Sequence, residues 1–123
     1  MAEKNYPLNK NGVDHRLKKK VQFNYIFRKG ERKSSKHFAL FVVKSKYPNY
    51  KIGYSISKKV GKAHERNLLK RRLRELVRTR MLCQNGHNYI LQAKIGASEL
   101  SYCEIENELK RIFDREAKGN ENN

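Results

Sequence analysis

The sequence has 123 residues, with 29 Lys or Arg against 12 Asp or Glu and a formal net charge of +17, and its length suits a single domain. It has no apolar stretch near the ~20 residues of a transmembrane helix, no hydrophobic signal region at its start and no Cys-x-x-Cys pair, so we expect a cytoplasmic protein with reduced, buried thiols. All of the excess positive charge lies before Met81, which points to nucleic acid as the partner.

The chain is expected to hold one RNA-binding domain over residues 14–117. The polar residues 1–13 predict a disordered basic tail, and residues 118–123 predict a second disordered tail. We see no internal repeat that would divide the chain further.

The first elements predicted are a helix and two strands. A short helix is expected over residues 21–28, where Phe23 and Phe27 stand four apart on one face. Strands are expected over residues 37–44 and 51–57, because apolar residues dominate the first and alternate with small residues in the second.

A basic helix is predicted over residues 64–80. At about 100° per residue, four apolar side chains fall on one arc, as expected for a core-facing stripe: Leu69, Leu73, Leu76 and Val77. Five polar side chains fall on the far side: Asn67, Lys70, Arg71, Arg74 and Arg78. A solvated basic face is the common interpretation of such a run. Here acids are nearly absent from that face, so the repulsion favours neutralisation by a polyanion.

The remainder of the chain predicts a strand over residues 88–93 and a last helix. Ser101 and Glu104 have the spacing of a capping box, which marks the start of that helix. The predicted order is therefore α–β–β–α–β–α. This order indicates an α+β fold, a two-layer sandwich in which helices pack on a small mixed β-sheet.

The aromatic residues of the first helix and first strand admit two interpretations. Phe23, Phe27 and Phe41 could all be core residues, as aromatics at helical spacing usually are. They could instead form the floor of a groove that holds unstacked bases. The surrounding cations favour the groove, and we predict that the three rings stay partly exposed. These cations are Lys18, Lys19, Lys20, Arg28, Lys29, Arg32 and Lys33.

Residues 55–75, SISKKVGKAHERNLLKRRLRE, resemble the signature of the bacterial ribonuclease P protein component. In that family a strand ending in Ser-x-Ser-Lys-Lys and a short glycine-containing loop precede an Arg-Asn-Arg-x-x-Lys-Arg helix. The segments RLKKKVQFNYIFRKG and HFALFVV and residues 88–115 extend the resemblance over most of the chain. One departure is Leu68, which replaces the second Arg of the triplet and removes one cation from the start of the helix.

The resemblance implies a fold like the second domain of ribosomal protein S-five, with a left-handed βαβ crossover. It also implies that a large RNA subunit carries out the Mg²⁺-dependent hydrolysis that removes the 5′ leader of precursor tRNA. The protein would bind this RNA through Lys58, Lys59, Lys62, Arg66, Asn67, Lys70, Arg71 and Arg74. It would hold the leader through Phe23, Phe27, Phe41, Lys19 and Lys20.

The sequence predicts neither a catalytic residue nor a metal site nor a cofactor held by the protein itself. Its four His are scattered without ligand spacing, and its acids gather after Leu100, away from the basic segment. The expected partners are ribonuclease P RNA and precursor tRNA, with no membrane and no small-molecule substrate.

Two other functions fit the composition. One is a structural RNA-binding protein of the ribosomal type with no role in cleavage. The other is a DNA-binding module that places helix 64–80 in a major groove. The DNA-binding hypothesis is weaker, because cations fill the polar face of helix 64–80 and leave few side chains to read bases.

Overall fold

The computed structural model describes residues 14–121, with side chains described up to residue 114. In chain order the elements are α1 (Lys20–Lys29), β1 (Glu31–Ser34), β2 (Phe38–Lys44), β3 (Lys51–Ile56), the short 3₁₀ helix η2 (Lys58–Val60), α2 (Ala63–Thr79), β4 (His87–Ala93), the 3₁₀ helix η3 (Ala97–Glu99) and α3 (Tyr102–Glu121). The tail expected at 1–13 lies outside the described residues. Helix α3 continues beyond the expected domain boundary at residue 117.

The four strands form one mixed sheet in the order β1-β2-β4-β3. Strands β1 and β4 both pair antiparallel with β2, whereas β3 and β4 are parallel neighbours. A parallel pair requires a crossover connection, and α2 supplies it between β3 and β4. The basic segment is therefore the crossover itself and is fixed at both ends by the sheet.

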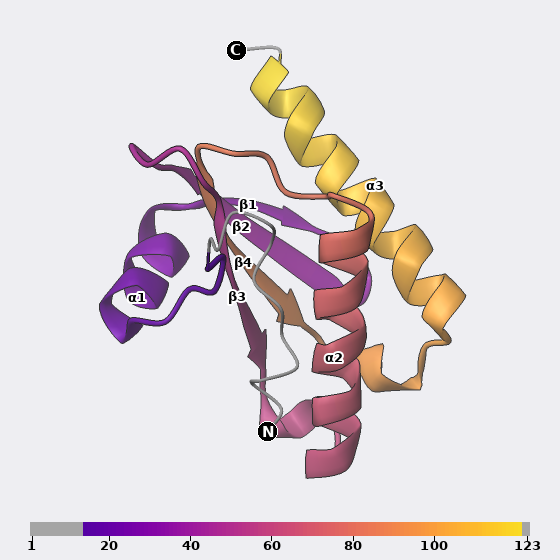
Figure 1. Cartoon of the computed structure of the whole chain (residues 1–123). Coiled ribbons are helices and arrows are strands. Elements are labelled where there is room, and N and C mark those ends of the chain that lie inside the picture. The colour runs from indigo at the N-terminus through magenta and orange to yellow at the C-terminus, as the bar shows by residue number, and fades with distance from the viewer. Residues whose placement is uncertain (1–13, 122–123) are drawn as a thin grey trace.

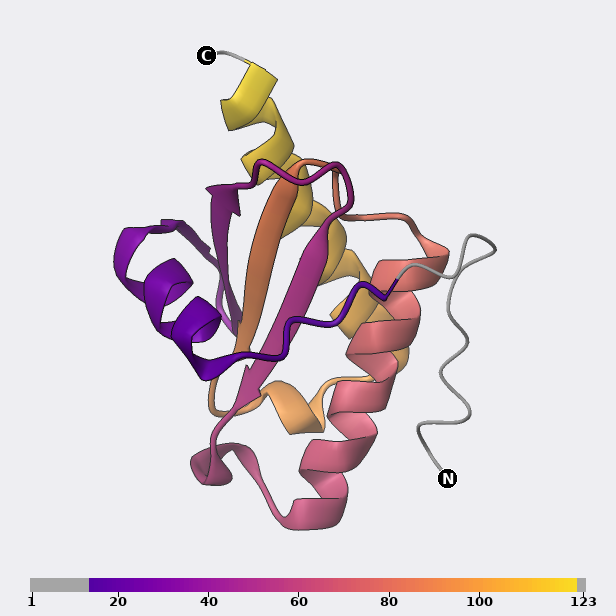
Figure 2. The same cartoon turned by 60° about the vertical axis from the view of Figure 1, so that its left-hand side comes forward.

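Helices cover both faces of the sheet, with α1 on one face and α2 and α3 on the other (Figures 1 and 2). The larger core contains Phe38 and Leu40 of β2 together with residues of α2, β4 and α3. The smaller core lies under α1 and contains Ile26 together with Ala39 and Phe41 of β2. Alternate residues of β2 therefore point into two different cores, as the period of two in a strand requires.

The predicted α+β class and the mixed sheet are confirmed, with two differences in detail. Helix α1 packs on the face of the sheet opposite α2 and α3, whereas one layer of helices was expected. Strand β1 was not predicted at all, because its sequence Glu-Arg-Lys-Ser has no apolar alternation. Its strand conformation comes from pairing with β2, a contact that local sequence does not encode.

The segment before α1 runs beside β3. The Leu17 amide donates to the Ile52 carbonyl at 3.0 Å, and the Ile52 amide donates to the His15 carbonyl at 2.8 Å. The His15 ring stacks on Tyr50, with ring centroids 3.9 Å apart. These contacts hold the start of the domain against the outer side of β3.

Helix α3 begins with the predicted capping box. The Ser101 amide donates to the Glu104 carboxylate at 2.8 Å, and the Glu104 amide donates to the Ser101 hydroxyl at 3.1 Å. Cys83 is only half-buried and Cys103 is exposed, so the expectation of buried thiols was wrong. Within the described part of the chain, no helix is long and apolar enough to cross a membrane.

Glu108 joins α3 to the connection between β1 and β2. Its carboxylate accepts hydrogen bonds from the Ser35 hydroxyl, from the His37 amide at 2.7 Å and from the His37 ring at 3.0 Å. Burial raises the pKa of Glu108, but the hydrogen bonds from Ser35 and His37 outweigh burial and hold the pKa below its ordinary value. The ionised carboxylate is therefore the form that the folded protein stabilises.

Glu108→Gln is expected to change how stability depends on pH. A lowered pKa in the folded state gives stability that is present above the ordinary value of 4.5 and is lost as pH falls through the folded-state pKa. Wild type should therefore be more stable than the variant at neutral pH, and the difference should shrink below about pH 4.5. Urea unfolding measured between pH 3 and pH 7 checks this. Parallel profiles for the two proteins would contradict it.

Candidate RNA interface

Helix α2 turns its cationic face to solvent, as the sequence predicts. The residues expected in the core are all at most 2% exposed, which confirms the helical phase: Leu69, Leu73, Leu76 and Val77. On the other side, Asn67, Arg71 and Arg78 are exposed, and Lys70 and Arg74 are half-buried at its margin. The cations therefore project from a helix whose opposite side is anchored in the larger core.

Leu68 stands on the outer part of α2 with 42% of its surface exposed. The departure from the family triplet is thus at a solvent-facing position, where an apolar side chain replaces a cation. The neighbours that match the triplet remain, with Arg66 half-buried and Asn67 exposed.

The loop before α2 is fixed rather than loose. Val60 is buried at 6% exposure, and its carbonyl accepts a hydrogen bond from the Ser98 hydroxyl at 3.0 Å. The Arg66 guanidinium donates to the Gly61 carbonyl at 3.1 Å, which ties the loop to the first turn of the helix. The Glu65 carboxylate folds back over this loop and accepts a hydrogen bond from the Lys62 amide at 2.7 Å. The three loop lysines of the predicted set are exposed on this anchored loop: Lys58, Lys59 and Lys62.

The electrostatics of α2 favour an anionic partner. Burial lowers the pKa of Lys70, and the positive charge of Arg74 lowers it further. At the far end of the helix, Arg80 pairs with Glu106 of α3 at 2.7 Å. Glu106 thus neutralises a cation at the end of the helix. Bound phosphate would relieve the repulsion between Lys70 and Arg74.

Phe23, Phe27 and Phe41 form an aromatic patch on the α1 face of the sheet. The Phe27 and Phe41 rings meet edge to face with centroids 4.9 Å apart. The Phe23 ring lies over Gly53, where an added Cβ would come within 2.3 Å of it. Phe23 is half-buried, and Phe27 is 36% exposed.

Phe41 departs from its predicted exposure. It is only 8% exposed and belongs to the smaller core with Ile26 and Ile90. The prediction that all three rings stay partly exposed was therefore wrong for Phe41, because α1 covers the face of β2 from which Phe41 projects. Phe23 and Phe27 retain exposed surface above it.

Cations surround this aromatic patch. The Arg32 guanidinium on β1 lies 5.9 Å from the Phe41 ring centroid, a cation–π distance. Lys19 and Lys20 are exposed at the start of α1, one turn before Phe23. Contact between these groups and leader nucleotides stays a prediction.

The sequence did not indicate that Tyr54 of β3 lies close to Arg74 of α2. Burial raises the pKa of Tyr54 well above its ordinary range, and the nearby cation Arg74 acts in the opposite direction. A neutral phenol thus lies beside one of the predicted RNA-binding cations. The alternation in β3 placed Tyr54 on the same side as Ile52 and Ile56, but only the three-dimensional structure brings α2 over that side.

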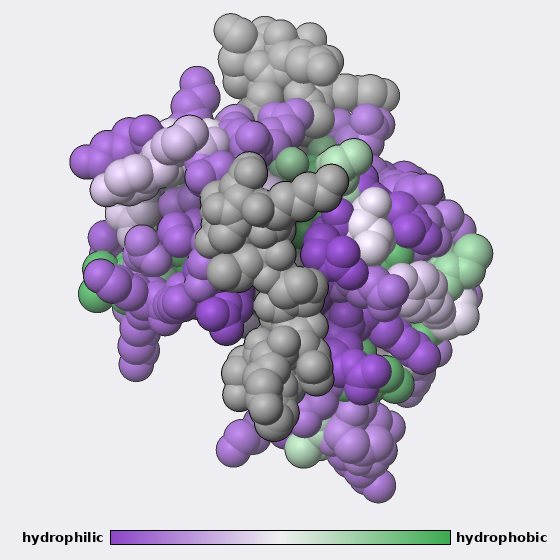
Figure 3. Space-filling view, viewed as in Figure 1, coloured by the Kyte–Doolittle hydropathy of each residue, from purple (hydrophilic) through white to green (hydrophobic). Residues whose placement is uncertain are grey.

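The described surface contains no group of three or more His, Cys, Asp or Glu side chains that could hold a metal ion. The face drawn in Figure 3 is largely hydrophilic over the described residues, with hydrophobic colour in small separate patches. The described part of this face is therefore mainly polar.

Comparison with known proteins decides the family. The family model described as Ribonuclease P matches residues 12–117. The chain belongs to the ribonuclease P protein family. It is 32% identical over 102 residues to the ribonuclease P protein component of Exiguobacterium sp., covering 83% of this chain and 90% of that protein. Identity to the Bacillus cereus component is also 32%, over 103 residues, covering 82% and 90%.

Solved structures agree with this ribonuclease P assignment. The RNase P protein of Staphylococcus aureus matches with a TM-score of 0.78 at 27% identity, covering 83% of this chain and 94% of that one. The protein of Thermotoga maritima matches with a TM-score of 0.70 at 27% identity, covering 80% and 98%. The resemblance to the bacterial ribonuclease P protein component is thereby confirmed. This ribonuclease P protein component is a subunit of the ribonucleoprotein that processes the 5′ end of tRNA.

Proposed function

We propose that this ribonuclease P protein component binds the catalytic RNA subunit through the loop before α2 and the outer face of α2. The observation that carries the proposal is the segregation of α2, whose buried stripe fixes the opposite row of cations in space. Cations at fixed positions neutralise phosphates and release counterions, and they set the register of the protein on the RNA. The proposed contacts are Lys58, Lys59, Lys62, Arg66, Asn67, Lys70, Arg71 and Arg74.

The aromatic patch is proposed to hold the single-stranded 5′ leader of precursor tRNA. Phe23 and Phe27 supply exposed ring surface, and Phe41 supports Phe27 from below. Rings accept any base by stacking, so leaders of different sequence suit such a surface. Lys19 and Lys20 would meet the phosphates of the same strand.

The hydrolysis itself is assigned to the RNA subunit, which would hold the Mg²⁺ that the reaction requires. The described protein residues form no cluster suited to such an ion. The protein's contribution is to position the substrate and to neutralise the charge of the RNA. Its proposed location is the cytoplasm, where precursor tRNA is made.

Reconstitution tests the proposed function. The full chain is mixed with a ribonuclease P RNA and a precursor tRNA at low Mg²⁺, and release of the leader is followed on a gel. Protein that increases the cleavage rate supports the proposal. Protein that binds both RNAs without changing the rate would favour a purely structural RNA-binding role.

Arg71→Ala is expected to weaken binding of ribonuclease P RNA and to lower the slope of log affinity against log salt by about one. Arg71 is exposed on the cationic face, so its loss removes a phosphate contact without opening the core. Arg111→Ala is the matched control, because Arg111 is exposed on α3 among acids. Titration at several salt concentrations gives both slopes. Equal slopes for wild type and Arg71→Ala would argue against a phosphate contact.

Phe27→Ala is expected to weaken binding of precursor tRNA while leaving mature tRNA unaffected. The exposed ring of Phe27 would stack on a leader base, an interaction worth about 1–3 kcal/mol. Affinities for both tRNAs are measured with the reconstituted holoenzyme. Equal weakening of the two would show that Phe27 does not contact the leader.

A further inference from the structure

The Ser98 side chain connects two segments that lie 38 residues apart in the sequence. Its hydroxyl donates to the Val60 carbonyl at 3.0 Å, and an added Cβ on Gly61 would lie 3.2 Å from the same oxygen. Ser98 belongs to η3, the turn between β4 and α3, whereas Val60 ends η2 in the loop before α2. Figures 1 and 2 show η3, drawn in orange after β4, beside the first half of α2.

The η3 turn is itself fixed in the fold. Ala97 has no exposed surface and belongs to the larger core. The Ala97 amide donates to the Lys94 carbonyl at 3.1 Å, and the Glu99 amide donates to the Gly96 carbonyl at 3.2 Å. Gly96 has a φ of 97°, in the left-handed region that favours glycine, and this conformation turns the chain into η3. Ser98 is therefore held in place by the residue before it, which is anchored in the core.

The Ser98 hydrogen bond restrains the loop before α2 from a different side than the other bonds of that loop. Arg66 donates to the Gly61 carbonyl, and Glu65 accepts from the Lys62 amide, so these two bonds join the loop to the first turn of α2. The bond from Ser98 joins the same loop to the segment that follows β4. The loop backbone is thus held between α2 and η3.

The loop lysines depend on this restraint. Lys58, Lys59 and Lys62 are exposed, and each lies within two residues of Val60 in the sequence. A binding loop that is already ordered loses less conformational entropy on binding than a mobile loop does. Without the Ser98 hydroxyl, the carbonyl at the end of η2 would have to bond to water, and RNA would have to order the loop again. Affinity would fall although no charge had been removed.

We propose that Ser98 is a positioning residue for ribonuclease P RNA. Its hydrogen bond to Val60 holds the loop lysines where phosphates of the RNA subunit meet them. The inference rests on the proposed function, because it assumes that the loop contacts the RNA subunit. It adds a neutral residue of η3 that acts through the loop without touching RNA itself.

A double-mutant cycle tests this role, with affinity for ribonuclease P RNA as the measurement. The full chain is compared with Ser98→Ala, with a loop variant in which Lys58, Lys59 and Lys62 are all alanine, and with the combination of the two. Ser98→Ala is expected to weaken binding about three- to tenfold, the scale of one lost hydrogen bond. In the loop variant, the same substitution should change the affinity by less than about twofold. Ser98→Thr keeps the hydroxyl and should bind within about twofold of wild type.

Ser101→Ala is the matched control. It removes another serine hydroxyl that bonds to the backbone, but this hydroxyl caps α3 and does not contact the loop. Both alanine variants should shift the urea midpoint of unfolding downward. Only Ser98→Ala should weaken RNA binding, so a general loss of stability is distinguished from a loss of loop position.

Several outcomes would overturn the inference. Equal weakening by Ser98→Ala in wild type and in the loop variant would show that Ser98 does not act through the lysines. Equal weakening by Ser98→Ala and Ser101→Ala would show that stability alone matters. If wild type stimulates cleavage by ribonuclease P RNA while Ser98→Ala binds as tightly as wild type, this inference is wrong and the proposed function stands. If the loop variant also binds as tightly as wild type, the proposed RNA contact of the loop is wrong as well.

Discussion

Leu73→Ala is expected to lower the free energy of unfolding by about 2–5 kcal/mol, the range for a leucine removed from a packed core. Leu73 has no exposed surface and lies in the larger core, where residues of α2 meet those of the sheet and α3. The shortened side chain leaves a cavity that rigid neighbours on three elements cannot fill. Urea unfolding followed by circular dichroism measures the loss.

Leu68→Ala is the matched control for this substitution. It makes the same chemical change on the same helix, but Leu68 is 42% exposed. Its loss should cost less than about 0.5 kcal/mol, as for other surface sites. If the two variants were equally stable, the helical phase of α2 would be wrong, and the proposed RNA-binding face would have to be redrawn.

Phe41→Ala is expected to lower the free energy of unfolding by about 3–5 kcal/mol. Its ring is 8% exposed and packs with Ile26 and Ile90 in the core under α1. Phe27→Ala should cost about 1 kcal/mol, the scale of an aromatic pair, because the Phe27 ring is 36% exposed and loses mainly its edge-to-face contact with Phe41. The same unfolding experiment compares them.

The Phe41→Ala and Phe27→Ala substitutions distinguish a ring that supports its neighbour from a ring that contacts RNA. Phe41 is proposed to hold Phe27 in position, whereas Phe27 presents the ring that meets the leader. A loss below about 1 kcal/mol for Phe41→Ala would contradict its burial and restore it as a surface residue of the patch.

The basic helix and the start of α3 were predictable because their signals are local. The apolar stripe of α2 repeats at helical spacing, and the Ser101–Glu104 capping box lies within four residues of sequence. The fixed face of cations follows directly from the stripe. A sequence pattern with a strong period therefore located most of the candidate RNA-binding side chains.

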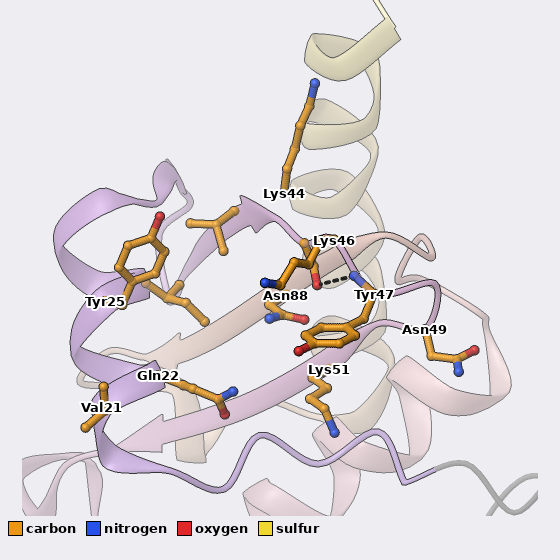
Figure 4. Close-up of a pocket in the computed structure, with 12 residues that line it drawn as sticks. Val21, Gln22, Tyr25, Lys44, Lys46, Tyr47, Asn49, Lys51 and Asn88 are labelled. Atoms are coloured by element: carbon orange, nitrogen blue, oxygen red, sulfur yellow. Dashed lines mark hydrogen bonds between the residues drawn. The ribbon is translucent and has the colours of Figure 1, made fainter.

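Tertiary packing decided what the sequence left open. Alternation in β2 showed that Phe41 points away from Phe38 and Leu40, but not that α1 would cover that face. Strand β1 exists because β2 offers it hydrogen bonds. A recess beside α1 is lined by Tyr25, Tyr47 and Asn88 from three separate segments (Figure 4), and no short-range pattern connects them.

The two outer strands of the sheet are each poor templates for self-association. Strand β1 carries Glu31, Arg32 and Lys33, and charged side chains on an outermost strand oppose its pairing with another copy. Strand β3 is already bonded along part of its outer side by residues 15–17. A chain of this charge also repels its own copies at neutral pH. We therefore expect the protein to remain monodisperse at concentrations where proteins with unprotected edge strands aggregate. A polyanion that binds several copies would remove this protection.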